Sequence, residues 1–400
     1  MTWPSPTFRL RRHALIVLAA LPLALIGCER TPTRARVIVV GVDGLDPDAV
    51  ELLATDGSLP NLADIRRTGA SGRVRPDEGS CAARWTTVAT GRPAGVHGVG
   101  AAGVAAPTSR DRHVKAVWNV FSEARRRVAV IGWWATWPAE TVRGAIVSDH
   151  ACYHFRDPDA PRGGLGTLST IYPPELQAEV LRMFRRPGDL TLPEAAAFVR
   201  VRNAEFRRPF DPDDDLSHFK WALAAAKSHG NVGLHLWQRD QPDLLLVYVE
   251  ALKVTAELFG HLFRGTEKNG RESEQFGNAV EAMYHYVDRL VGEFRQAMDH
   301  RTTLVVVSDR GFPLGTRRPA NGQERTRGTE GVLYLNGWRV RPGATLGPVD
   351  PLDIVPTVLA LADLPSADDM PGRVLAEGLV LEGRKPTVPT YEQSASRAPR

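Results

Sequence analysis

The chain has 400 residues, of which 43% are hydrophobic and 24% are charged. This composition is typical of a globular protein with a sizeable core and excludes a disordered chain. The net charge of +4 is small for this length, and no basic run interleaves with aromatic residues, so we expect no nucleic-acid surface.

The N-terminus has the pattern of an export signal with a lipidation site. Three arginines precede an apolar run, residues 14–26, that is too short to span a bilayer comfortably and ends in small residues before Cys28. We interpret residues 1–28 as a lipoprotein signal peptide and Cys28 as the lipid-bearing residue; an ordinary signal peptide is the alternative. Glu29 is not the aspartate that retains such proteins at the inner membrane. We therefore expect anchoring at the periplasmic face of the cell envelope, in the outer membrane, after Sec or twin-arginine export.

Apolar, β-branched runs alternate with helical patterns along the rest of the chain. The first run, residues 36–43, ends in Asp43, and Asp46 can cap a helix that starts at Pro47. This alternation indicates an α/β fold with a largely parallel sheet, whose ligands lie at the carboxyl ends of the strands. Further strands are predicted at residues 127–132, 144–148, 243–249, 302–308 and 331–335, and long helices at residues 272–298 and 351–364.

Residues 153–241 interrupt the alternation with Pro/Gly-rich, Asp/Arg-rich and helical stretches. We interpret them as a helical insertion that covers the active edge of a domain spanning residues 29–383. Residues 384–400, rich in Pro, Ser, Thr and Arg, are predicted to be a disordered tail. Helices inside the insertion are expected at residues 174–184, 192–206 and 216–227.

The segment Ser308-Asp309-Arg310-Gly311-Phe312 closes the predicted strand at residues 302–308. It resembles the Ser-Asp-His-Gly-Phe signature of the type I phosphodiesterase/nucleotide pyrophosphatase family in the alkaline phosphatase superfamily. The resemblance implies an alkaline-phosphatase-like three-layer sandwich, with a mostly parallel central sheet flanked by helices. Other elements similar to that family follow its order: Val40 to Gly44, Leu59 to Leu62, Trp85 to Thr87 with Thr90-Gly91, Gly95 to Gly98, Trp134 to Pro138, Val147 to Asp149, Asp353 to Leu359 and Met370 to Arg373.

In that family two zinc ions about 4 Å apart clamp a displacement at phosphorus. The resemblance implies six ligands, three Asp and three His, and a Ser or Thr nucleophile, for hydrolysis of a phosphodiester or phosphomonoester. Asp43 and Asp309 match two ligand positions, and Cys81 stands at the position of the nucleophile. The other ligand positions fall on Lys253, Glu257, Arg310 and Arg327.

Arginine and lysine donate no lone pair to a metal, whereas their charges can neutralise carboxylates. We therefore predict a salt-bridge cluster in place of zinc: the carboxylates of Asp43, Glu257 and Asp309 against the cations of Lys253, Arg310 and Arg327. The chain is then a metal-free pseudoenzyme with a binding or scaffold role at the envelope. Three alternatives to the pseudoenzyme hypothesis remain: a retained site for phosphate or another small anion, a reactive thiol at Cys81, and an active metal-dependent hydrolase. The sequence does not indicate a protein partner.

Several residues offer alternative roles. Glu257 could pair with His261 as an acid-x-x-x-His ligand pair, and Ser80 could replace Cys81 as the nucleophile. A sulfatase, which needs an arginine four residues after its cysteine, is disfavoured because Trp85 stands there.

The compartment would permit a disulfide between Cys81 and Cys152, and His150 and His154 flank Cys152 in a possible metal cluster. His97 is expected to be a hydrogen-bonded scaffold residue. The tryptophans at positions 133, 134 and 137 are expected in the core rather than on a substrate platform.

Overall fold

The computed structural model describes residues 1, 34–100, 107–153, 169–265, 270–312, 314–315, 329–383 and 386–392. The predictions for Cys28, His154 and Arg327 lie outside these residues, as does the side chain of Cys152. The unit from Arg34 to Arg400 is described below.

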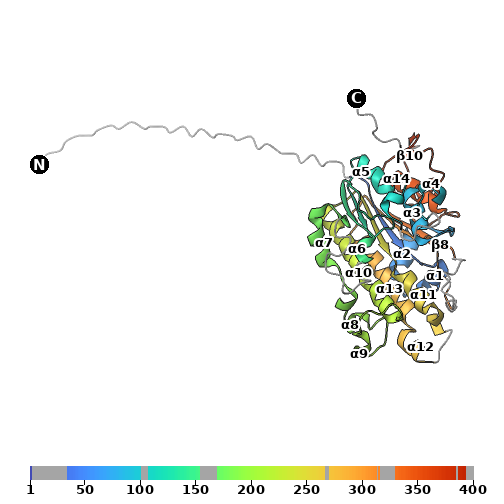
Figure 1. Ribbon diagram of the computed structural model, residues 1–400. Helices are drawn as coiled ribbons and strands as arrows, with labels where there is room; N and C mark the ends of the chain where they lie inside the picture. The colour runs from blue at the N-terminus through green and yellow to red at the C-terminus, as the bar shows by residue number, and fades with distance from the viewer. Residues whose placement is uncertain are drawn as a thin grey trace. The chain divides into compact units, whose positions relative to one another are not determined.

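A central sheet runs through this unit in the order β5-β4-β3-β6-β1-β7-β8-β2-β9 (Figure 1). The strands β4, β3, β6, β1 and β7 are parallel to one another, whereas β8 runs antiparallel to both of its neighbours. Parallel strands buried on both faces read as continuous apolar runs, which explains why the sequence revealed them. The bounds are β1 Arg36–Val42, β2 Ala70–Val74, β3 Val128–Ile131, β4 Gly144–Val147, β5 Ile171–Tyr172, β6 Leu244–Val249, β7 Thr302–Val307, β8 Gly331–Gly337 and β9 Ala344–Thr345.

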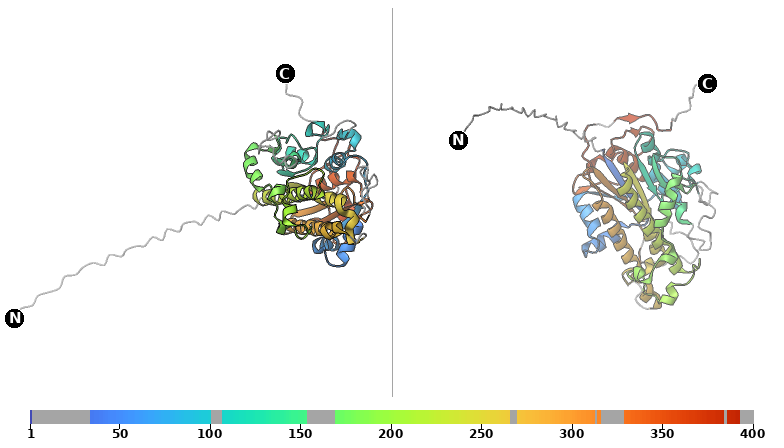
Figure 2. Two further views of the ribbon diagram at one scale, coloured as in Figure 1. Left: turned by 60° about the horizontal axis from the view of Figure 1, so that its bottom comes forward. Right: turned by 90° about the vertical axis from the view of Figure 1, so that its left-hand side faces the viewer.

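Helices cover both faces of the sheet, so the three-layer sandwich is confirmed (Figure 2). Alternate residues of β1 divide between the layers: Ile38 and Val40 join the core beneath α1, α2, α10, α11 and α13, and Val37 and Val39 join the core beneath α3, α5 and α14. These helices are α1 Pro47–Thr55, α2 Pro60–Thr68, α3 Cys81–Thr90, α5 Val117–Glu123, α10 Asp215–Asp240, α11 Ala251–Phe259, α13 Ala279–Gln296 and α14 Ile354–Leu361.

Shorter helical segments complete the described chain. They are α4 Ala94–His97, α6 His150–Tyr153, α7 Gln177–Met183, α8 Leu192–Ala195, α9 Asn203–Phe206 and α12 Arg271–Phe276, with the 3-10 turns η1 Ser109–Asp111, η3 Pro174–Leu176, η4 Pro187–Asp189, η5 Gly260–Gly265, η6 Pro351–Asp353 and η7 Ala376–Gly378.

The helices differ more from the sequence-based expectation than the strands do. The helix expected at residues 272–298 is divided into α12 and α13 at Gly277, whose amide closes α12 on the carbonyl of Ser273. The helix expected at residues 192–206 is interrupted, because the Arg200 amide bonds to the carbonyl of Gln275 on α12 instead of to its own turn. Tertiary hydrogen bonds override helix propensity in both places.

The C-terminal segment also differs from expectation. Part of the tail predicted to be disordered forms β11 (Thr387–Val388), which pairs with β10 (Ser366–Ala367). The Tyr391 hydroxyl donates to the carbonyl of Pro365 at 2.5 Å, and the Glu392 carboxylate accepts from the backbone amide of Lys115. Composition alone missed these specific anchors.

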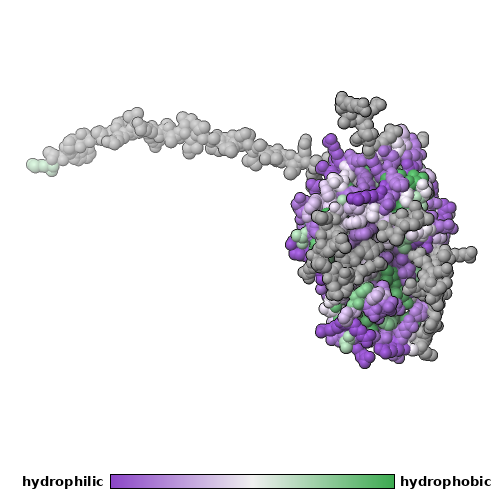
Figure 3. Space-filling view, viewed as in Figure 1, coloured by the Kyte–Doolittle hydropathy of each residue, from purple (hydrophilic) through white to green (hydrophobic). Residues whose placement is uncertain are grey.

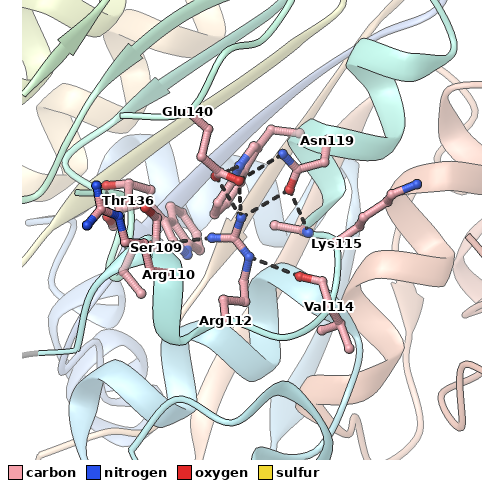
Figure 4. Close-up of polar contacts among 12 residues, drawn as sticks. Ser109, Arg110, Arg112, Val114, Lys115, Asn119, Thr136 and Glu140 are labelled. Carbon is pink, nitrogen blue, oxygen red and sulfur yellow. Dashed lines mark hydrogen bonds and ion pairs between the residues drawn. The ribbon is translucent and has the colours of Figure 1, made fainter. Parts of the chain in front are cut away.

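Arg112 fixes the loops on the α5 side of the sheet (Figure 4). Its guanidinium donates to both carboxylate oxygens of Glu140, to the side chain of Asn119 and to the carbonyls of Val114 and Ala135. With every direction of its fork engaged, this buried arginine is a structural clamp.

The viewed surface is mainly hydrophilic, with hydrophobic residues in small areas (Figure 3). Among the described residues of the unit, the exposed large hydrophobic ones are Leu52, Val96, Leu181 and Val380, which lie far apart in the sequence. Among the described residues, no helix has the length and apolar character needed to cross a membrane.

Candidate functional site

Two carboxylates lie side by side at the carboxyl ends of neighbouring strands. β1 and β7 pair in parallel with Gly41 opposite Val307, so Asp43 and Asp309, each two residues further on, leave the sheet together. Both side chains have 0% exposure. A pair of buried carboxylates requires cations, protons or hydrogen-bond donors in the same place.

The glycines on either side of Asp43 make room for the site. A Cβ atom on Gly41 would lie 2.7 Å from the ring of Trp85 and 2.9 Å from that of Trp133. Gly44 has φ +84°, and a Cβ atom there would approach the Cα atom of Lys253 to 2.9 Å. The glycines of the first motif therefore permit close packing of aromatic rings and of α11 against the end of β1.

Tyr248 supplies a hydrogen bond to Asp43. Its hydroxyl donates to Asp43 Oδ2 at 2.8 Å, and its ring packs edge-on against Trp85 at 5.0 Å. Burial and the neighbouring Asp43 charge raise the pKa of Tyr248 well above its ordinary value, so the phenol stays protonated and remains a donor.

The principal cation at Asp309 is Arg84, which sequence reasoning missed. Arg84 Nε donates to Asp309 Oδ2 at 2.5 Å, and the two side chains are 1% and 0% exposed. The same guanidinium donates to the carbonyl of Gly79 and to Cys81 Sγ, the latter at 3.3 Å. One signal could have revealed it: Arg84 follows Cys81 by three residues, which places both on one face of α3.

Arg310, one of the cations of the predicted cluster, lies further from Asp309 than Arg84 does. Its Nε atom is 3.8 Å from Asp309 Oδ2, and its Nη2 atom donates to the carbonyl of Asp77 at 2.6 Å. Arg84 and Arg310 thus both hold the loop before α3 through its backbone carbonyls. Burial and the adjacent Asp43 charge raise the pKa of Asp309 to about 6, with the two arginines opposing that shift.

Lys253 and Glu257 lie one turn apart on α11, where their charged atoms are 3.3 Å from each other. Burial disfavours the Lys253 charge, but Asp43 and then Cys81 and Glu257 outweigh it and raise the pKa of Lys253 well above its ordinary value. The ammonium is therefore retained beside the carboxylates. The described part of the predicted cluster, all but Arg327, is held around the ends of β1 and β7.

Cys81 is the first residue of α3, and its buried thiol forms no disulfide within the part of the chain that the structure describes. Burial, followed by the negative charges of Asp43 and Asp309, raises the pKa of the Cys81 thiol to about 12, although Lys253 and Arg84 act in the opposite direction. Ser80, the alternative nucleophile, instead caps α3 by accepting a hydrogen bond from the Ala83 amide at 3.3 Å.

The remaining candidate residues have other engagements. His261 pairs with Glu272 at 3.0 Å, and the ring of His150 stacks on Trp137. His97 is buried, accepts from the Val99 amide at Nδ1 and contacts Thr87 through Nε2, and burial lowers its pKa to about 4. That geometry is a scaffold role. Trp133 is in the core, whereas Trp134 and Trp137 are half-buried.

The sheet order and the paired carboxylates at the ends of β1 and β7 define an alkaline-phosphatase-like protein. Solved structures of that superfamily resemble it at low sequence identity. A mutant of the alkaline phosphatase PafA has a TM-score of 0.51 at 11% identity, covering 87% of this chain and 99% of its own. The phosphonate monoester hydrolase of Silicibacter pomeroyi has a TM-score of 0.48 at 15% identity, covering 86% and 76% respectively. An alkaline phosphatase superfamily protein from Vibrio parahaemolyticus has 0.45 at 14% identity, covering 87% and 71%.

A narrower assignment comes from the sequence. Residues 37–322 match the profile of the type I phosphodiesterase/nucleotide pyrophosphatase family, and the chain belongs to that family. No protein of the curated set matches the sequence significantly.

Proposed function

We propose that this chain is a metal-free, non-hydrolysing member of its family that acts by binding or scaffolding at the cell envelope. The observation that carries the proposal is the buried ion pair between Arg84 and Asp309. The guanidinium of Arg84 hydrogen-bonds to an oxygen of Asp309, and Asp309 stands at a position where the family has a zinc ligand.

The side chains present do not fit a zinc pair. Zinc in proteins is bound by carboxylates, neutral imidazoles and thiolates. Of the ligand positions in the described chain, Lys253 and Arg310 are cationic and have no lone pair to donate. Two zinc ions would add four positive charges beside the ammonium of Lys253 and the guanidinium of Arg84, which like-charge repulsion opposes.

The nucleophile position is also unsuited to attack. A thiolate, and not a thiol, is the reactive form of cysteine. With the pKa of Cys81 raised to about 12, the thiol is neutral at physiological pH. The described neighbours of Cys81 include the carboxylates of Asp43 and Asp309, whose negative charges oppose formation of a thiolate.

One observation favours the alternative, an active metal-dependent hydrolase. Asp43 Oδ1 and Asp309 Oδ1 are buried and have no hydrogen-bond partner among the described residues. Such atoms could face a cation. We weigh this below the Arg84 pair, because the neighbouring Lys253 ammonium already supplies positive charge to Asp43.

The predicted anion site stays a prediction. Arg84 already donates to Asp309 and Gly79, and Arg310 to Asp77, so neither guanidinium offers a full fork to a phosphate. The envelope role rests on lipidation of Cys28, which the intact mass of the protein purified from membranes would test. The unmodified mass of a cleaved or uncleaved chain would overturn the anchor.

The decisive experiment measures bound zinc and hydrolysis of an aryl phosphodiester with added zinc. We expect no stoichiometric zinc and no turnover above background. Stoichiometric zinc in the wild type, or turnover that Asp309→Ala abolishes, would overturn the proposal.

A restored variant provides the positive control. It carries Cys81→Thr, Lys253→Asp, Glu257→His, Arg310→His and Arg327→His. The structure requires one further change, Arg84→Ala, to release Asp309. We expect zinc to raise the Tm only when Arg84 is replaced as well, so the five-change and six-change variants are compared directly.

A further inference from the structure

The opposite edge of the sheet, where the five parallel strands begin, is rich in arginine. Backbone hydrogen bonds place the residues before these strands next to one another: the Val128 amide donates to Arg143, and the Asp243 amide donates to Arg127. The Arg36 amide donates to the carbonyl of Arg301. Arginine thus precedes or opens β1, β3, β4 and β7 along one edge.

Four of the arginines near this edge are exposed: Arg34, Arg125, Arg127 and Arg143. None has a carboxylate partner among the described residues. The carboxylates nearby are already paired, since Asp299 binds Arg36 at 2.6 Å and Asp243 binds Arg126 at 3.4 Å. The four exposed arginines, named here the basic edge, therefore leave an unbalanced positive surface.

The chain connects the basic edge directly to the predicted anchor. Only residues 29–33 separate Cys28 from Arg34. Six residue steps span at most about 20 Å when fully extended. A lipid on Cys28 would keep Arg34, two residues before β1, within that distance of a bilayer, whatever conformation the connecting residues adopt.

We propose that the basic edge docks on the headgroups of anionic phospholipids and orients the protein on the membrane. The proposal rests on the lipid anchor of the proposed function. Guanidinium forks match phosphate oxygens, and an arginine near an anionic bilayer contributes about 1 kcal/mol. A single lipid modification with a basic patch holds a protein more stably than either signal alone.

This docking would turn the carboxyl ends of the strands, with Asp43 and Asp309, away from the bilayer. Parallel strands all end at the side opposite their starts, so the two edges of the sheet face in opposite directions. The loop at residues 75–80 and α11 would then point into the aqueous compartment, where a partner could reach them.

The test uses the full chain carrying Cys28→Ser, so that lipidation does not contribute. Binding is measured by flotation with vesicles of phosphatidylcholine alone and of phosphatidylcholine mixed with phosphatidylglycerol. Replacing Arg125, Arg127 and Arg143 by glutamine should weaken binding to the anionic vesicles on the order of 100-fold, from about 1 kcal/mol for each arginine. Raising the salt concentration should weaken the wild type in the same direction.

The matched control replaces Arg200, Arg202 and Arg207 by glutamine. These arginines are also exposed without a carboxylate partner among the described residues, and they flank α9, at the end of the molecule away from α5 (Figure 1). This control should bind the anionic vesicles as well as the Cys28→Ser parent does. The N-terminal apolar run is present in every variant, so its contribution to binding is the same in all of them. Equal loss in both triple variants, or no loss in the basic-edge variant, would overturn the proposal. An unlipidated Cys28 in the wild type would contradict the lipid anchor of the proposed function. The vesicle experiment, which uses Cys28→Ser, tests the basic edge alone.

Discussion

The two edges of the central sheet use positive charge in opposite ways. At the carboxyl ends of the strands, Arg84 and Lys253 are buried against Asp309 and Asp43. At the amino ends, the basic edge is exposed and has no carboxylate partner among the described residues. Arginine content alone therefore predicts neither stability nor binding, because the surroundings of each guanidinium decide its contribution.

Desolvation explains the difference. A charge removed from water must be matched by a partner, and removing that partner leaves an uncompensated buried charge. An exposed arginine remains hydrated and contributes little to folding, yet it stays available to an anionic surface. The carboxyl edge should therefore dominate stability, whereas the amino edge should dominate association.

The largest expected effect is that of Arg84→Met, which leaves the carboxylate of Asp309 buried without its main cation. We expect the free energy of unfolding to fall by about 3–5 kcal/mol, measured by urea denaturation. The double variant Arg84→Met/Asp309→Leu should recover most of this loss, because it removes both charges together.

A surface pair provides the control for Arg84. Arg373 and Glu377 form an ion pair at 2.8 Å with side chains 51% and 35% exposed, and Arg373→Met should cost less than about 1 kcal/mol. Similar losses for Arg84→Met and Arg373→Met would remove the proposed contrast between buried and exposed arginines.

The next effect concerns His229, which lies on α10 and donates from Nδ1 to the carbonyl of Tyr248 at 2.8 Å. Burial lowers the pKa of His229 to about 4. The unfolded chain takes up a proton below about pH 6.5, whereas the folded chain resists it, so stability falls as the pH falls. Between about pH 7 and pH 5 this residue should remove roughly 2 kcal/mol.

The variant His229→Gln isolates this dependence, because glutamine does not titrate. Its free energy of unfolding should be lower than that of the wild type at neutral pH, and the difference should shrink at acidic pH. Asp149 and Asp309, whose pKa values are raised to about 6, act in the opposite direction but equally in both proteins. A constant difference between wild type and variant across this range would contradict a neutral, buried His229.

The smallest effect is expected at the basic edge. Replacing Arg125, Arg127 and Arg143 by glutamine should change the free energy of unfolding by no more than about 0.5 kcal/mol for each residue. Urea denaturation of the same preparations used with vesicles would check this. A large loss of stability would mean that these arginines have structural partners, and the two edges would then be alike.

The positions of the parallel strands could be predicted because buried parallel strands have uninterrupted apolar sequences. Strands β1, β3, β4, β6 and β7 lie within a few residues of their expected positions. The short strand β2 was not predicted, since Ala70–Val74 contains only two buried apolar residues and obtains its place by pairing with β8. Its structure is set by tertiary contacts rather than by its own pattern.

The site was predictable where a motif fixes the register, as at Asp43 and Asp309. Arg84 was missed because it stands at no ligand position of the family motifs, and its only sequence signal is its place three residues after Cys81 on α3. Arg310 was predicted as one cation of the cluster; its Nε atom lies 3.8 Å from Asp309 Oδ2, and its Nη2 atom donates to the carbonyl of Asp77. Long side chains choose among several acceptors, and sequence spacing alone does not distinguish them.

Ser308, the first residue of the family signature, has a structural role. Its hydroxyl accepts from the Leu45 amide at 3.1 Å and donates to the carbonyl of Arg310 at 2.7 Å, so it joins the loops that follow β1 and β7. This joint needs serine but makes no demand on the side chain at position 310. The Ser-Asp-x-Gly-Phe motif therefore indicates the fold and not the set of metal ligands. In other chains with this motif, activity should be assigned only after the side chain at the position of Arg310 has been identified.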